Sequence, residues 1–130
     1  MKLKCIIIDD EPIARKVLRE FVEEIDYLEL TGQAENPLKA ISLLNDNEID
    51  IVFLDINMPA MDGWEFLDRY EAMPEAHKNS VIVIMLTTSF NPEDELKARN
   101  IPSVKEFRNK PLTPALLEDI LKRYFPDNCG

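Results

Sequence analysis

Five short apolar runs, separated by segments with helical spacing, constrain the fold of this chain more than any other feature of the sequence. The runs are Cys5–Ile8, Tyr27–Leu30, Ile51–Leu54, Val81–Leu86 and a weaker Val104–Phe107. In several of the intervening segments, apolar residues recur every three or four positions, which is the period of an amphipathic helix. This alternation predicts an α/β fold, in which helices cover both faces of a parallel sheet.

Proline marks the starts of the predicted helices. Asn36-Pro37, Asn91-Pro92 and Thr113-Pro114 each place a capping side chain directly before a proline, the favoured arrangement of a first helical turn. Glu11-Pro12 begins the first helix in the same way, although glutamate is a poorer cap. Asp62, which precedes Gly63, is expected to cap the third helix.

The charges within the runs predict the order of the strands. Strands that are buried on both faces are continuously apolar, and the first, third and fourth runs are of this kind. The segments YLELTG and SVKEFRN carry charges and fit the two edges. We therefore expect one domain over residues 1–130, a flavodoxin-like (βα)5 fold whose doubly wound five-stranded parallel sheet has the order 2-1-3-4-5. Ligands bind to such sheets at the carboxyl ends of strands 1 and 3.

Polar side chains follow the predicted strands at this edge. Asp9 and Asp10 end the first strand, Asp55 the third and Thr87 the fourth, and Lys110 follows the fifth. Three carboxylates close together repel one another, and a hard divalent cation such as Mg²⁺ relieves that repulsion. Carboxylates, a metal ion, a hydroxyl and an ammonium group are the parts of a phosphoryl-transfer site, in which an aspartate can act as the nucleophile.

Each of these residues also has a plain structural explanation. An aspartate after a strand is most often a turn or capping residue, Lys110 alone is most often a surface residue, and Thr87 alone a satisfied strand-end hydroxyl. The functional interpretation is favoured because four strands place suitable groups on one edge of the sheet.

The motifs that contain these residues resemble a known family along the whole chain. IIIDDEP, FLDINMPAMDGWEF, VIMLTT and FRNKPLT, in this order, are similar to the motifs of the receiver domain of two-component response regulators. The resemblance implies that Asp55 is the phosphoacceptor. It also implies that Asp10 binds Mg²⁺ directly, Asp9 mainly through water, and Asn57 through its backbone carbonyl.

The same resemblance implies a switch. Thr87 would hydrogen-bond the phosphoryl group, Lys110 would form an ion pair with it, and Phe107 would turn inward when Thr87 moves. The surface of the fourth helix, fifth strand and fifth helix would then change for a partner. Thr88 departs from the small residue that is common in the family, and the fourth helix, PEDELKARN, has few apolar residues and is expected to be loosely held.

Because the sequence ends soon after the fifth predicted helix, at RYFPDNCG, we expect a stand-alone signalling protein. The resemblance implies no enzyme beyond self-phosphorylation and autodephosphorylation. A histidine kinase or a histidine phosphotransfer protein would supply the phosphoryl group, and a downstream protein would be the target. The net charge of −10 argues against direct binding of nucleic acid. No apolar run approaches the roughly 20 residues that span a bilayer, so we expect no membrane insertion and a cytoplasmic protein.

Three other functions are compatible with parts of the sequence. The chain could be a protein-binding module that works without phosphorylation, or the receiver part of a longer transcriptional regulator. A Mg²⁺-dependent phosphohydrolase of the haloacid dehalogenase type is disfavoured, because that type has a D-x-D motif after its first strand, whereas here Asp9 and Asp10 are adjacent. A zinc site is disfavoured because His77 is the only histidine, and Cys5 is expected to be a small core residue.

Overall fold

The fold is a single parallel sheet with helices on both faces. The computed structural model describes residues 2–56, 63–73, 81–87, 91–110 and 112–127. The strands are β1 (Leu3–Ile8), β2 (Leu28–Ala34), β3 (Ile51–Asp55), β4 (Ile82–Thr87) and β5 (Val104–Asn109). They pair in parallel in the order β2-β1-β3-β4-β5, so the predicted sheet and its two charged edge strands are confirmed.

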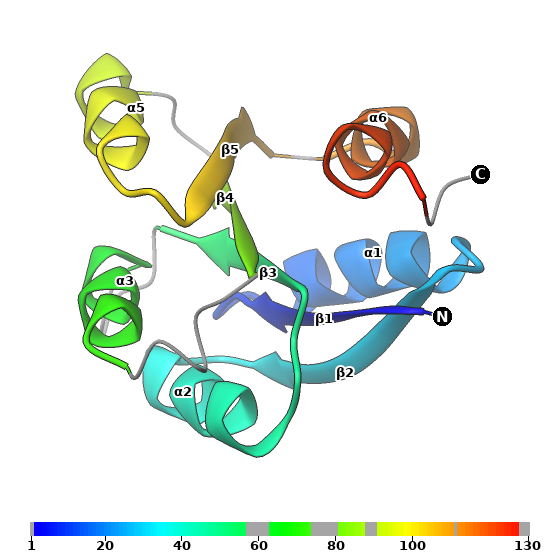
Figure 1. Ribbon diagram of the computed structural model, residues 1–130, viewed down its shortest axis with the longest axis horizontal. Coiled ribbons are helices and arrows are strands. Elements are labelled where there is room, and N and C mark those ends of the chain that lie inside the picture. Colours follow the sequence, from blue (N-terminus) through cyan, green and yellow to red (C-terminus); the bar gives the residue numbers. More distant parts are fainter. Residues whose placement is uncertain (1, 57–62, 74–80, 88–90, 111, 128–130) are drawn as a thin grey trace.

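Helices cover both faces of this sheet. They are α1 (Pro12–Glu23), α2 (Pro37–Asp46), α3 (Gly63–Glu71), α5 (Pro92–Arg99) and α6 (Pro114–Tyr124). Figure 1 shows α1 and α6 on one side of the sheet and α2, α3 and α5 on the other. Because side chains alternate along a strand, each face has its own core: Ile6 and Ile8 pack with α2 and α3, whereas Ile7 packs with α1 and α6.

The helix starts follow the capping pattern. The side chains of Asn36, Asn91 and Thr113 each accept a hydrogen bond from a backbone N–H of the first turn. Glu11 makes no such bond, as expected for a poor cap. The prediction for Asp62 lies outside the described residues.

Cys5 is a core residue, as the sequence predicts. It lies fully buried on β1, and burial, together with the charges of Asp50 and Glu29, raises the pKa of its thiol to about 12. The thiol therefore stays protonated and packs as a small apolar group.

The two helices that flank β5 are held very differently. In α6, the side chains of Leu117, Ile120 and Leu121 are fully buried. In α5, Ala98 is buried but Leu96 is 62% exposed. The ammonium of Lys97 lies 4.4 Å from the centre of the Trp64 ring, which adds a contact with α3. No helix among the described residues is long and apolar enough to cross a membrane.

Candidate functional site

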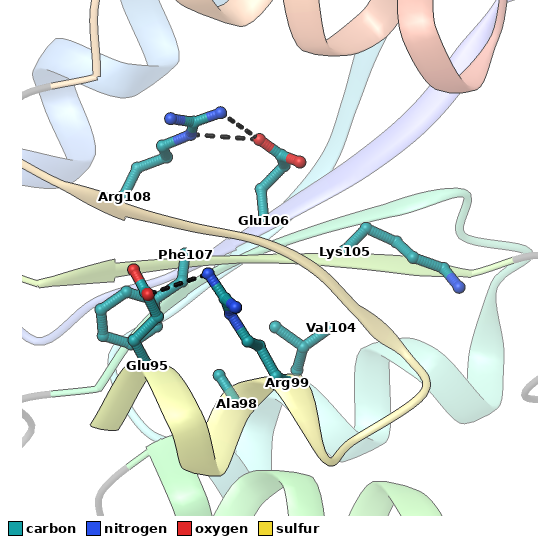
Figure 2. Close-up of a pocket in the computed structure, with 8 residues that line it drawn as sticks. All are labelled: Glu95, Ala98, Arg99, Val104, Lys105, Glu106, Phe107 and Arg108. Atoms are coloured by element: carbon teal, nitrogen blue, oxygen red, sulfur yellow. Dashed lines mark hydrogen bonds and ion pairs between the residues drawn. The ribbon is translucent and has the colours of Figure 1, made fainter. Parts of the chain in front are cut away.

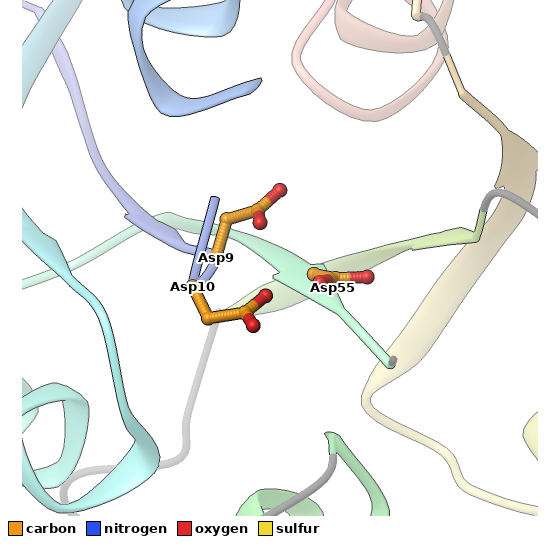
Figure 3. A group of neighbouring side chains, drawn as sticks. All are labelled: Asp9, Asp10 and Asp55. Carbon is orange, nitrogen blue, oxygen red and sulfur yellow. The ribbon is translucent and has the colours of Figure 1, made fainter. Parts of the chain in front are cut away.

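Three aspartates meet at the carboxyl ends of β1 and β3. These strands are neighbours, with Ile8 opposite Leu54, so the residues that follow them lie at the same edge. Asp9, Asp10 and Asp55 each offer a carboxylate oxygen within 4.8 Å of the others (Figure 3). Asp9 and Asp55 are buried, and Asp10 is half-buried.

Lys110 is the cation of this cluster. Its Nζ donates a hydrogen bond to Oδ2 of Asp9 at 2.6 Å and lies 3.4 Å from Oδ1 of Asp55. Burial lowers the pKa of Lys110, but the hydrogen bond to Asp9 and the charges of Asp9, Asp55 and Glu11 outweigh it and raise the pKa above 10.5. The ammonium is therefore charged at neutral pH, directly beside the Asp55 carboxylate.

The backbone around Asp9 is fixed by two contacts. The N–H of Glu11 donates to Oδ1 of Asp9 at 2.9 Å, and the guanidinium of Arg15 donates to the backbone carbonyl of Asp9. The sequence analysis did not identify Arg15. Arg15 could have been identified from its position in the first turn of α1, just after Pro12, because that turn lies next to the end of β1.

Thr87 lies at the same edge. It is the last residue of β4, it is fully buried, and it follows Leu86, which pairs with Asp55. Its carbonyl accepts a hydrogen bond from the N–H of Lys110 at 2.7 Å, which ties the loop after β5 to β4.

Phe107 lies deeper in the sheet, on the face that α5 covers. It pairs with Met85, two residues before Thr87, so both residues belong to the same face. Phe107 is half-buried and lines a pocket of about 230 Å³ between α5 and β5 (Figure 2). Asn57 and Thr88 lie outside the described residues.

The donor set suits a hard cation. Three carboxylates face one ammonium, which leaves an excess of two negative charges, and carboxylate oxygens are the ligands that Mg²⁺ prefers. The carboxylate of Asp9 already accepts bonds from Glu11 and Lys110. Among the described residues, none forms a hydrogen bond or ion pair with the Asp10 carboxylate, so Asp10 is the most available ligand.

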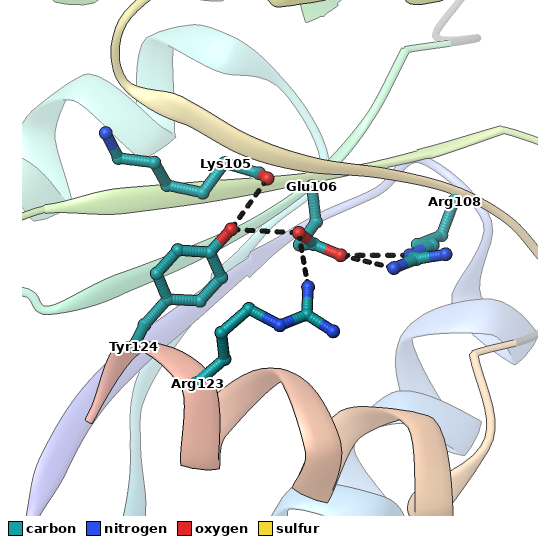
Figure 4. Close-up of polar contacts among 5 residues, drawn as sticks. All are labelled: Lys105, Glu106, Arg108, Arg123 and Tyr124. Carbon is teal, nitrogen blue, oxygen red and sulfur yellow. Dashed lines mark hydrogen bonds and ion pairs between the residues drawn. The ribbon is translucent and has the colours of Figure 1, made fainter. Parts of the chain in front are cut away.

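A second polar cluster joins β5 to α6. The buried carboxylate of Glu106 accepts hydrogen bonds from Arg108, from Arg123 at 3.1 Å and from the hydroxyl of Tyr124 at 2.9 Å (Figure 4). Burial raises the pKa of Glu106, but the hydrogen bonds from Arg108 and Tyr124 and the charges of Arg108 and Arg123 outweigh it and hold the pKa below 4.5. The cluster fixes the end of α6 to the edge strand.

This cluster predicts a pH-dependent stability. A lowered pKa means that Glu106 stabilises the fold above about pH 4.5, and that this contribution is lost as the pH falls through the lower folded-state pKa. Because Arg108 and Arg123 are partly solvated, we expect Glu106→Gln to lower the free energy of unfolding by about 1.5 kcal/mol at pH 7. Urea unfolding from pH 7 to pH 3 would measure this. The exposed Glu118→Gln is the control, and an equal loss in both variants would contradict the prediction.

Comparison with known proteins identifies the family. The family model of the response regulator receiver domain matches residues 5–122. The chain belongs to this family and is a receiver domain of two-component systems.

Similar proteins agree with this assignment. The protein-glutamate methylesterase/protein-glutamine glutaminase 3 of Burkholderia thailandensis is 34% identical over 110 residues, which cover 84% of this chain and 29% of that protein. The transcriptional regulatory protein BtsR of Escherichia coli is 33% identical over 121 residues, which cover 93% of this chain and 47% of BtsR. The chain thus spans less than half the length of these relatives.

A solved structure has the same architecture over nearly the whole chain. The two-component response regulator from Cytophaga hutchinsonii superposes with a TM-score of 0.86 at 27% identity, covering 97% of this chain and 99% of that one. The chemotaxis protein CheY4 of Vibrio cholerae, at 23% identity and a TM-score of 0.81, shares the fold.

Proposed function

We propose that this receiver domain signals by phosphorylation of Asp55. A histidine kinase or a histidine phosphotransfer protein in the cytoplasm donates the phosphoryl group. The observation that carries the proposal is the environment of Asp55, which is 2% exposed, lies 3.4 Å from the Lys110 ammonium and faces two further carboxylates.

The chain's own residues perform the transfer. A carboxylate oxygen of Asp55 attacks phosphorus, and the bond from phosphorus to the donor's leaving atom breaks, with its electron pair remaining on the leaving group. Lys110 is positioned to pair with a phosphoryl oxygen, because its Nζ already lies beside Oδ1 of Asp55. Thr87, at the end of the adjacent strand, supplies a hydroxyl for a second phosphoryl oxygen.

Asp9, Asp10 and Asp55 would hold Mg²⁺, together with the backbone carbonyl that the family resemblance assigns to Asn57. When bound, Mg²⁺ supplies neutralisation of the charge on the transferring phosphoryl group. Asp10 would be the direct ligand, because its carboxylate is the one without a bond to a described residue, and Asp9 would act mainly through water.

The output is a change of the surface formed by α5, β5 and α6, which are the fourth helix, fifth strand and fifth helix of the sequence prediction. A phosphoryl group adds about 1.5 to 2 negative charges at neutral pH, and Thr87 moves toward it. Phe107 shares the face of Thr87 and borders the α5–β5 pocket, so its rotation would alter the contacts of α5. A downstream protein reads the altered surface, and no nucleic acid or membrane contact is part of the proposal.

Two alternatives stand beside it. Residues 1–130 could act as the receiver part of a longer transcriptional regulator. This alternative is favoured by the match to BtsR, because the chain covers only 47% of that protein. A binding module that works without phosphorylation would need none of the site groups, and the presence of a buried Asp55 beside Lys110 disfavours it.

The test of the proposal is the intact mass after incubation with acetyl phosphate. We expect wild-type protein to gain one phosphoryl group with Mg²⁺ and none with EDTA, because the excess negative charge of the three aspartates repels the donor. Asp55→Asn removes the nucleophile and should abolish the gain. Asp68→Asn, the same change at an exposed position of α3, should leave it intact. A gain in Asp55→Asn equal to that of wild type would contradict the proposal.

A further inference from the structure

An apolar pocket of about 320 Å³ adjoins the aspartate cluster on the α1 side of the sheet. Two of its lining residues, Asp9 and Lys110, belong to the cluster described above. The remaining lining is apolar and comes from α1, from the end of β4 and from the segment after β5: Ala14, Val17, Leu18, Phe21, Leu86 and Leu112. The volume falls within the range of sites that hold small organic molecules.

The pocket reaches the surface through α1. Among its lining residues, Leu18 and Leu112 are buried, whereas Val17 is 36% exposed and Phe21 is half-buried. An apolar group that enters the pocket would remove these side chains from water, which is favourable in proportion to the area covered.

Lys110 connects this pocket with Asp55. Its Nζ lies 3.4 Å from Oδ1 of Asp55, and its side chain lines the pocket, so a single side chain borders both places. A molecule with a phosphoryl group at Asp55 and an apolar group attached to it would fit this arrangement. The ammonium of Lys110 favours an anion at the junction of the two parts.

We propose that the pocket accepts the apolar leaving group of a small acyl phosphate, so that this domain is phosphorylated faster by aromatic acyl phosphates than by acetyl phosphate. The inference rests on the proposed function of Asp55. The Asp55 oxygen forms a bond to phosphorus, the bond between phosphorus and the acyl oxygen breaks, and the electron pair leaves with the carboxylate. That carboxylate lies beside Lys110, and its aromatic ring lies among Val17, Phe21 and Leu112.

The test compares the initial rates with benzoyl phosphate and acetyl phosphate in Mg²⁺, measured by intact mass. Ala14→Leu fills the pocket, because Ala14 lines it. Ala115→Leu is the matched control: it makes the same change at an exposed position of α6 that does not line the pocket. The ratio of the benzoyl to the acetyl rate should be about tenfold lower in Ala14→Leu than in wild type and Ala115→Leu, because the leucine side chain occupies the space in which the phenyl ring would cover apolar surface. The acetyl phosphate rate should be the same in all three proteins.

A second variant protects the test against misfolding of Ala14→Leu. Val17→Thr keeps the shape of a partly exposed side chain and replaces a methyl group by a hydroxyl, and it should lower the same ratio severalfold. An unchanged ratio in both folded variants, with normal rates from acetyl phosphate, would overturn the pocket inference and leave the proposed function intact. No phosphorylation from either donor would overturn both.

Discussion

Lys110→Met is expected to lower the free energy of unfolding by about 3 kcal/mol at pH 7 in the absence of divalent cations. The side chain of Lys110 is 13% exposed, and its ammonium compensates two carboxylates, those of Asp9 and Asp55, whose side chains are 7% and 2% exposed. Methionine has a similar length and keeps most of the packing. The loss therefore comes from leaving buried carboxylates without a counter-charge.

The comparison with an exposed lysine isolates this charge effect. Lys105→Met removes the same charge from an exposed position of β5 and should change the stability by less than about 0.5 kcal/mol. Urea unfolding in EDTA measures both variants. The raised pKa of Lys110 gives a further check: its contribution is complete below pH 10.5 and is lost as the pH rises through the higher folded-state pKa. Equal losses in the two variants at pH 7 would show that the aspartates do not depend on Lys110.

The second large effect concerns the two helices beside β5. Leu117→Ala is expected to lower the free energy of unfolding by about 3 kcal/mol, because it leaves a cavity in the core between α6 and the sheet. Leu96→Ala makes the same change in α5 at a side chain that is 62% exposed, and it should cost less than about 0.5 kcal/mol. Thermal or urea unfolding of the two variants tests the contrast directly. A cost for Leu96→Ala as large as that for Leu117→Ala would mean that α5 is packed as firmly as α6.

This contrast bears on the proposed switch. The proposal needs an element near Phe107 that can change its contacts at little cost, and local stability is low where few apolar side chains are buried. Among the α5 side chains, only that of Ala98 is buried, and α5 borders the pocket that Phe107 lines. By contrast, α6 is fixed by its leucines and by the Glu106 cluster, so it provides a rigid side to the same surface.

Much of the fold was predictable because the burial of a strand determines whether its residues are apolar or charged. The central strands must be apolar on both faces, which identified β1, β3 and β4, and charges identified the edges. The length of β2 was not predictable in this way. The apolar run ends at Leu30, but the strand continues to Ala34, because its register shifts at Thr31 and the residues from Gly32 to Ala34 then pair again with β1.

The site was predictable to the extent that strand ends define it. Asp9, Asp55, Thr87 and Lys110 lie at the predicted edge because each follows or ends a strand whose place in the sheet was known. Glu106 was different. Its charge predicted an edge strand, yet the side chain is buried, because it bonds to Arg123 and Tyr124 of α6. These partners lie 17 and 18 residues further along the chain. Such a contact depends on how α6 packs against β5, and no local pattern in the sequence predicts it.

The most direct test of the central claim is to locate the phosphoryl group. Protein phosphorylated by acetyl phosphate in Mg²⁺ would be reduced with borohydride, which converts an aspartyl phosphate to homoserine, and then digested and sequenced by tandem mass spectrometry. We predict homoserine at position 55 and at no other aspartate. Homoserine at position 9 or 10, with Asp55 unmodified, would contradict the assignment of Asp55 as the phosphoacceptor.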